Sequence, residues 1–269
     1  TATIGNKVSA KLESLSAGGN NYTSIVETTS VERTIKAGFK GTYTIGKSSS
    51  ADYATFAAAI ADMKGGVEGA VEFKVEAGTY NENVLIKDIR GTSAENTITF
   101  TSASGKNNDV VIKGSGYSAT SSYGMFAVDS TSYVTVENMS LIPTDQSYKY
   151  NMHIRRISRH FTLRNCILTA NLITSGYSGM NHFYMESINE EGKNNDYVTV
   201  DGNIITGGYI ALYMGGTGYV ALSKEKGAVI RNNKMYNQAS KGIYIFDERD
   251  ALVENNTIIS ETTTKTGYQ

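Results

Sequence analysis

A column of tyrosine and arginine side chains is the part of this sequence whose chemistry best suits ligand binding. Aligned on an alternating apolar pattern, the outward positions of successive segments are Ala127, Arg155, Tyr184, Tyr213 and Tyr244. The flanking positions are His153 and His182 on one side, and Asp129 and Glu186 on the other. A tyrosine ring offers an apolar face and a polar hydroxyl to a sugar, and an arginine can bind a carboxylate or sulfate through two hydrogen bonds. The column predicts a strip that binds a linear glycan.

The same column has a structural interpretation that needs no ligand. Stacked β-coils often place like residues above one another on the outside as well as the inside. Aromatic rings on adjacent strands stabilise each other by about 0.2 to 1 kcal/mol per pair. A strip of tyrosines is therefore also expected of a protein that only needs a stable sheet.

The densest polar cluster, from His153 to His160, suggests a second kind of chemistry. A lyase acting on a uronate chain must neutralise the carboxylate, remove the C5 proton and protonate the leaving oxygen. Arg155 or Arg159 could serve the first step, and the proton transfers have the candidates His153, His182 and Tyr184. The alternative is a solvated charged surface with no catalytic role.

Metal and cofactor sites have little support in the sequence. The loop from Asp247 to Asp250 carries carboxylates that suit calcium, but its spacing matches no known calcium loop and Arg249 favours local ion pairing. The histidines His153, His160 and His182 are too few and scattered for a zinc site. We expect neither a metal nor a cofactor.

A repeated phrase shows how such side chains would be positioned. Its five copies begin at Val136, Leu163, Val200, Ile230 and Val253, and each reads as a strand, a tight corner rich in Asn, and a second strand. The intervals are unequal while the phrase persists, as stacked β-coils with variable loops allow. Asn tolerates left-handed backbone, and its side chain can bond the neighbouring coil. Met139 and Cys166 interrupt the predicted Asn ladder at its early end.

A second alternating phrase lies just upstream of each copy, so successive coils place strand above strand in parallel sheets. We predict one solenoid domain over residues 42–269, preceded by an N-terminal leader at residues 1–41. A helix is expected at residues 53–64, where Phe56, Ile60 and Met63 share one face and Gly65 and Gly66 end it. This helix would cover the apolar floor of the first coil.

The stretches Ala51–Ile60 and Val71–Val84 resemble the opening of pectinesterases and other pectin-lyase-like proteins. The resemblance extends over roughly residues 42–260. It implies an all-β fold, a single-stranded right-handed parallel β-helix with a short N-terminal capping α-helix. The family includes polysaccharide lyases, glycoside hydrolases, esterases and many secreted or adhesin-like surface proteins. The signature motifs of its pectinesterases, polygalacturonases and pectate lyases are absent here, so an enzyme of this family would most plausibly be another polysaccharide lyase.

The composition limits the kinds of partner that the protein is expected to bind. With 25 basic and 26 acidic residues the formal net charge is −1, which gives no electrostatic case for nucleic acid. No apolar run approaches the roughly 20 residues of a membrane-spanning helix, so we expect no membrane insertion. Abundant Gly and Tyr with no Trp are typical of a β-rich extracellular protein. We predict an extracellular or cell-surface module that binds a polysaccharide or other glycan, acidic ones included, or acts as an adhesin. The alternatives are a lyase on acidic polysaccharide and a structural spacer within a longer surface protein.

Overall fold

The computed structural model describes residues 37–114, 123–144, 150–172, 181–186, 192–215 and 224–261, and four short strands nearer the N-terminus. The chain divides into two compact units, Thr1–Gly38 and Phe39–Gln269. In the first unit, β1 (Lys7–Ala10) pairs with β4 (Val31–Thr34) and β2 (Ser16–Ala17) with β3 (Asn20–Asn21), both antiparallel. Most of the predicted leader lies outside the described residues.

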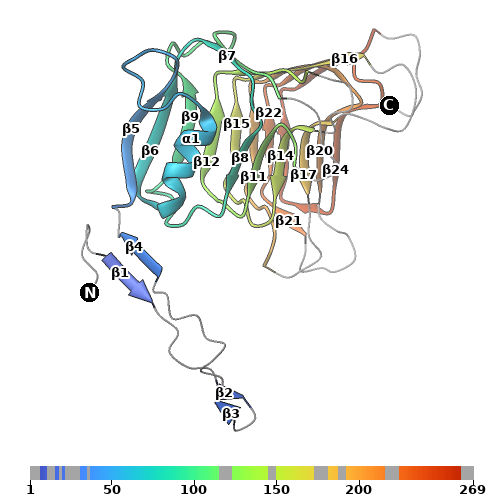
Figure 1. Cartoon of the computed structure of the whole chain (residues 1–269). Coiled ribbons are helices and arrows are strands. Elements are labelled where there is room, and N and C mark those ends of the chain that lie inside the picture. Colours follow the sequence, from blue (N-terminus) through green and yellow to red (C-terminus); the bar gives the residue numbers. More distant parts are fainter. Residues whose placement is uncertain are drawn as a thin grey trace. The chain divides into compact units, whose positions relative to one another are not determined.

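The second unit is built from three parallel sheets that the chain visits in turn (Figure 1). Sheet 1 contains β5 (Phe39–Ile45), β6 (Val67–Val75), β9 (Ile98–Ser102), β12 (Val134–Glu137), β15 (Thr162–Arg164), β18 (Thr199–Asp201), β22 (Val229–Arg231) and β26 (Leu252–Glu254). Sheet 2 contains β7 (Gly78–Tyr80), β10 (Val110–Ile112), β13 (Ser140–Leu141), β16 (Ile167–Leu172), β19 (Ile204–Gly208), β23 (Lys234–Tyr236) and β27 (Thr257–Ile259). Sheet 3 contains β8 (Val84–Lys87), β11 (Phe126–Asp129), β14 (Tyr150–Arg155), β17 (Asn181–Glu186), β20 (Ile210–Gly215) and β24 (Lys241–Phe246). A short parallel pair, β21 (Glu225–Lys226) with β25 (Glu248–Arg249), forms at one corner. The predicted parallel solenoid is confirmed.

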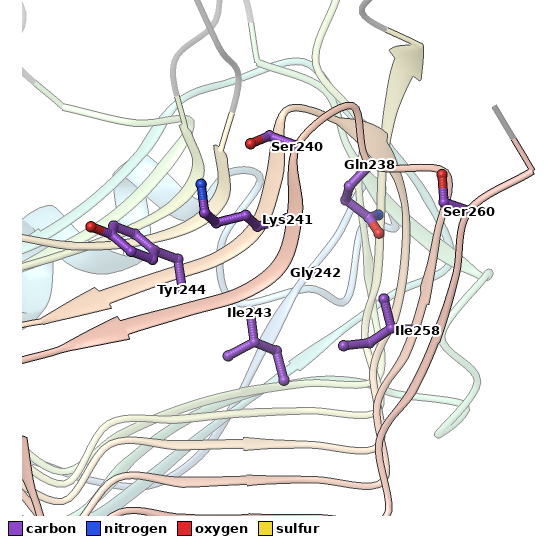
Figure 2. A pocket seen from close by; sticks show the side chains of 8 residues that line it. All are labelled: Gln238, Ser240, Lys241, Gly242, Ile243, Tyr244, Ile258 and Ser260. Atoms are coloured by element: carbon purple, nitrogen blue, oxygen red, sulfur yellow. The ribbon is translucent and has the colours of Figure 1, made fainter. Parts of the chain in front are cut away.

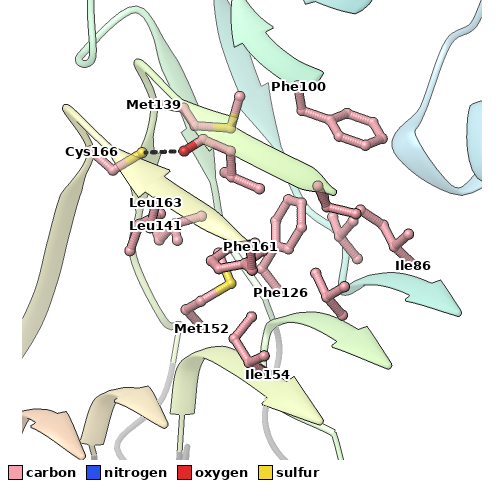
Figure 3. Packing of buried hydrophobic residues seen from close by; sticks show 14 of the residues in the cluster. Ile86, Phe100, Phe126, Met139, Leu141, Met152, Ile154, Phe161, Leu163 and Cys166 are labelled. Carbon is pink, nitrogen blue, oxygen red and sulfur yellow. Dashed lines mark hydrogen bonds between the residues drawn. The ribbon is translucent and has the colours of Figure 1, made fainter. Parts of the chain in front are cut away.

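The core is a set of apolar columns that run along the solenoid (Figure 3). In sheet 1, residues in register from coil to coil are Phe73, Phe100, Val136, Leu163, Val200 and Ile230. All are almost fully buried, because side chains alternate between the two faces of each strand. Cys166 is also buried and donates its thiol to the Val136 carbonyl oxygen at 3.7 Å. Burial raises the pKa of this thiol to about 12, so it stays protonated.

The Asn corner between sheets 1 and 2 uses two consecutive positions. The first takes the left-handed backbone conformation in each coil, and its residues are Asn138, Asn165, Gly202, Asn232 and Asn255. The second faces inward and forms the ladder. There the Asn203 side chain donates to the Leu163 carbonyl at 3.0 Å, and its backbone N–H donates to the Asn233 side chain at 3.0 Å. Met139 and Cys166 occupy this position in the earlier coils, so the predicted interruption of the ladder is confirmed.

The capping helix is shorter than the sequence indicated. Helix α1 spans Phe56–Asp62 and continues as the 3₁₀ turn η2 (Met63–Gly65), whereas Tyr53 forms a parallel bridge with Ile45. The predicted start at residue 53 is wrong because Thr55 is the N-cap: its hydroxyl accepts the Ala58 N–H at 3.1 Å. Phe56 enters the core, with its ring centroid 5.7 Å from that of Phe100. The helix therefore packs on the first coil as predicted. Among the described residues, no helix combines the length and apolar character needed to cross a membrane.

Replacing Thr55 by alanine should lower the free energy of unfolding by about 1 kcal/mol, because it removes the side-chain cap of α1. Thr55→Ser keeps the hydroxyl and should cost less. Urea denaturation followed by far-UV circular dichroism measures both. Equal stability of the alanine and serine variants would show that the cap contributes nothing; the Glu82 carboxylate, which accepts the Phe56 and Ala57 N–H groups, would then suffice.

Candidate functional site

The outward column on sheet 3 differs from the predicted one at a single coil. The registered residues are Leu85, Ala127, His153, Tyr184, Tyr213 and Tyr244. His153, not Arg155, lies in the tyrosine column, because Met152 rather than Ile154 pairs with Phe126. A shift of two residues preserves the inward and outward alternation, so the sequence pattern specifies the face but not the register.

Four tyrosines on this face form a continuous row of ring contacts, which we call the tyrosine strip: Tyr150, Tyr184, Tyr213 and Tyr244. Successive ring centroids are 4.1, 4.9 and 5.2 Å apart. The first two pairs are stacked, with interplanar angles of 15° and 29°, and the last is edge-on at 63°. In the stacked pairs each ring covers the face of its neighbour, so a ligand would meet ring edges rather than the ring faces expected from the sequence.

Tyr150 was missed by the sequence analysis because it lies at the start of β14, outside the alternating phrase. Only its register opposite Asn181 and its contact with Tyr184 bring it into the strip. Burial, with the neighbouring Tyr150 and Tyr213, raises the pKa of Tyr184. The Tyr184 hydroxyl is therefore neutral at ordinary pH and acts as a hydrogen-bonding group, not as a base.

A charged cluster lies beside the strip. Asp129, Arg155 and Glu186 are in register on adjacent strands. Arg155 donates through Nε and Nη2 to the two carboxylate oxygens of Glu186, with Nη2 to Oε1 at 3.0 Å. Burial acts to raise the pKa of Glu186, but hydrogen bonds from His153 and Arg155 outweigh it and hold the pKa at about 2. Glu186 thus stays ionised and neutralises the guanidinium of Arg155.

His153 has both ring nitrogens engaged. Its Nδ1 accepts the Gly124 backbone N–H at 3.3 Å, so Nε2 carries the proton and donates to Glu186 at 3.1 Å. The side chain is almost fully buried, and this burial lowers its pKa. His153 is therefore neutral at pH 7 and has no lone pair free to take a substrate proton in this arrangement.

His182 lies inside the molecule, away from the surface of the strip. It is fully buried at the corner between sheets 2 and 3, where its Nε2 donates to the Gly207 carbonyl at 3.0 Å. Its Nδ1 lies 3.1 Å from the side-chain nitrogen of Asn151. Burial lowers the pKa of His182 to about 4. The prediction that His153 and His182 flank the strip at the surface is wrong, because the corner between sheets 2 and 3 encloses the start of β17.

Arg159 and His160 lie on the corner between sheets 3 and 1. Arg159 donates to the carbonyl oxygens of Gly192 and Asn194, at 2.8 and 3.3 Å. His160 is stacked between the rings of Tyr133 and Tyr197, with centroids 4.4 and 4.8 Å away. The structure therefore brings His153 and Arg155 together, and assigns Arg159 and His182 to corner contacts.

The carboxylate-rich loop from Asp247 to Asp250 makes main-chain contacts. Glu248 is in register with Glu225 and accepts the Ala228 N–H at 3.0 Å. Burial raises the pKa of Glu248 to about 7. Within the described ranges, no group of three or more His, Cys, Asp or Glu side chains could hold a metal ion.

Three parallel sheets wound into one solenoid, with a polar and aromatic strip on an outer face, define a parallel β-helix protein. A family model described as "Right handed beta helix region" matches residues 150–266. The solved structure of an alginate lyase from Paenibacillus sp. str. FPU-7 is similar with a TM-score of 0.50 and 17% identity, over 80% of this chain and 75% of that one. No curated protein matches the sequence. The resemblance to right-handed parallel β-helix proteins of the pectin-lyase-like type is confirmed for the fold, which this chain shares with that alginate lyase.

Proposed function

We propose that this chain is an extracellular or cell-surface β-helix that binds a polysaccharide along the tyrosine strip. The observation that carries the proposal is the unbroken line of Tyr150, Tyr184, Tyr213 and Tyr244 over four successive coils. A linear glycan lying parallel to the solenoid axis would meet one tyrosine edge per coil. Neutral phenol hydroxyls both donate and accept hydrogen bonds, as sugar hydroxyls do.

The neighbouring cluster favours binding over catalysis. Arg155 is held by Glu186, and His153 uses both nitrogens within the protein. These groups provide fixed polar contacts at the side of the strip. They present neither an unpaired cation nor an available base, which a lyase on a uronate chain requires.

Replacing Tyr184 and Tyr213 together by phenylalanine should weaken glycan binding about tenfold or more. The change removes two hydroxyls, each contributing about 0.5–1.5 kcal/mol when hydrogen-bonded, and keeps the stacked rings. A glycan array followed by calorimetry on the best ligand measures the loss. Tyr197→Phe, on a corner outside sheet 3, is the matched control and should bind as the wild type does.

Unchanged affinity of the double phenylalanine variant would remove the strip from the binding surface. Failure of the wild-type protein to bind any glycan on the array would favour the structural spacer instead. Either outcome is separable from misfolding, because the rings that pack on one another are retained.

The second candidate is a lyase on acidic polysaccharide, favoured by the placement of His153, Arg155 and Tyr184 on one face and by the fold shared with an alginate lyase. Incubation with a panel of uronate polysaccharides, followed by the absorbance of the unsaturated product, tests it directly. Activity abolished by Arg155→Gln would support this candidate, and the absence of product across the panel would end it.

A further inference from the structure

The last coil of the described chain contains a pocket of about 440 Å³ (Figure 2). It lies between the start of β24 and the strand β27, and Tyr244 of the tyrosine strip is among its lining residues. Its volume is within the range of roughly 300–1,000 Å³ that small-ligand sites occupy. The pocket therefore adjoins the strip and is large enough for a sugar unit.

A glycine brings two walls of this pocket close together. In β20 and β24, Ile210 pairs with Lys241 and Leu212 with Ile243, so Ala211 lies opposite Gly242. A Cβ atom on Gly242 would approach the Ile258 side chain to 2.8 Å. The glycine thus lets Ile258 pack against the backbone of β24, at a position where the two preceding coils carry the buried side chains of His182 and Ala211.

Gln238 contributes an acceptor that lacks a partner. Its side-chain nitrogen donates to the carbonyl oxygens of Ile205, Gly207 and Tyr236, at 3.2, 3.3 and 2.9 Å, which fixes the orientation of the amide. The residue is 6% exposed, and its Oε1 is buried with no hydrogen-bond partner. Because buried acceptors are normally satisfied, this oxygen suits a ligand that brings a hydroxyl donor.

The rest of the lining combines a cation with apolar surface. Of the described residues that line the pocket, Lys241 alone is charged, and its Nζ lies 5.1 Å from the centroid of the Tyr244 ring. Among the described residues it forms no ion pair. Ile243 and Ile258 supply apolar surface opposite these polar groups (Figure 2). A hydroxyl donor, a carboxylate and an apolar ring face together describe a uronate sugar.

We propose that this pocket binds a uronate unit of a glycan, with a ring hydroxyl on Gln238 and the carboxylate on Lys241. The inference rests on the proposed glycan-binding function, because Tyr244 belongs to both the strip and the pocket.

The test uses single sugars, which are too short to span the strip. Galacturonate, glucuronate and mannuronate are titrated, each beside its neutral parent sugar, into protein with labelled isoleucine methyl groups. At least one uronate should shift the Ile243 and Ile258 signals, and its neutral parent should bind about tenfold more weakly. Lys241→Met should weaken that uronate about tenfold, since it removes the charge and keeps the aliphatic stem. Lys234→Met, an exposed lysine on β23, is the control and should bind as the wild type does.

Gly242→Ala should abolish binding of both sugars, because its methyl group displaces the Ile258 side chain that lines the pocket, with the far-UV spectrum unchanged. Ile258 is 52% exposed and can move to admit the methyl group. The proposal is overturned if no uronate shifts the two isoleucines, or if Lys241→Met binds as the wild type does. Concentration-dependent self-association that Gly242→Ala removes would also overturn it, by showing that a second copy occupies the pocket. Polymer binding by the tyrosine strip is measured separately with the double phenylalanine variant, so the two proposals fail independently.

Discussion

Replacing Phe100 by alanine is expected to lower the free energy of unfolding by about 3–5 kcal/mol. Phe100 is fully buried, and its ring stacks on Phe73 with centroids 4.7 Å apart. Phe56 of helix α1 stacks on it at 5.7 Å, and Phe126 of sheet 3 meets it edge-on at 6.2 Å. Truncation therefore removes contacts to the capping helix and to two sheets, and it leaves a cavity that the surrounding strands cannot close.

Chemical denaturation followed by far-UV circular dichroism measures this loss; the absence of tryptophan excludes the usual indole fluorescence. Phe100→Leu is the graded control and should cost much less, because it refills most of the cavity. A solenoid can lose its terminal coils separately, so proteolysis of the first coil should also accelerate in the alanine variant. A loss below about 1 kcal/mol would contradict the role of Phe100 as the junction of cap and core.

Acidification from pH 7 to pH 4 should remove about 3 kcal/mol of stability through His182 alone. The pKa of its imidazole is lowered from 6.5 to about 4 in the folded protein, and each pKa unit corresponds to about 1.36 kcal/mol. The cause is burial without a partner for a second proton. Asn151 donates from the same nitrogen to the Leu141 carbonyl, so it cannot turn its oxygen toward His182 without losing that bond.

Proton uptake by the unfolded chain explains why acidification lowers the stability. Below pH 6.5 the unfolded chain binds a proton at this histidine that the folded protein does not, so stability is full above pH 6.5 and falls as the pH approaches 4. The lowered pKa of His153 acts in the same direction. Glu186, whose pKa is about 2, loses its contribution only below its ordinary value of 4.5. Glu248, whose pKa is raised to about 7, acts in the opposite direction over the same pH range, so the contribution of His182 is obtained by comparison with a variant that lacks this histidine.

His182→Gln is the matched variant, since its amide can donate to the Gly207 carbonyl but does not titrate. Between pH 7 and pH 4 the unfolding free energy of the wild type should fall by about 3 kcal/mol more than that of His182→Gln. Urea denaturation at several pH values measures both. Identical pH profiles for the two proteins would show that His182 takes up its proton without cost.

Local patterns were enough to predict the coil and its Asn corner. The corner demands a left-handed backbone at its first position and, at its second, a side chain that bonds the neighbouring coil; Asn meets these requirements at Asn232 and Asn233, respectively. The alternation of Phe183 with Tyr184 likewise determines which side of the strand faces the core. The start of α1 was harder, because its cap at Thr55 competes with earlier polar residues that are equally suitable in sequence.

The sequence predicts which side of the strands carries the candidate site, but not how the side chains of the site are arranged on that side. Tyr184, Tyr213 and Tyr244 were placed together because each follows an inward apolar residue by one position. Arg155 was placed among them because Met152 and Ile154 are interchangeable as inward residues, and a shift of two costs nothing in the pattern. The pairing with Glu186 follows from the true register, and no local feature of the sequence indicates it.

The sequence by itself determined that the chain winds into parallel coils and which side chains face outward, since both follow from strand periodicity and corner chemistry. The tertiary structure alone decided that the tyrosines cover one another's faces, that His182 is enclosed, and that Gly242 packs against Ile258 beside a pocket. These outcomes depend on contacts between residues that are far apart in the sequence: Tyr150 with Tyr184, His182 with Gly207, and Gly242 with Ile258. Register and loop length set those contacts, and neither is encoded in the residues that touch.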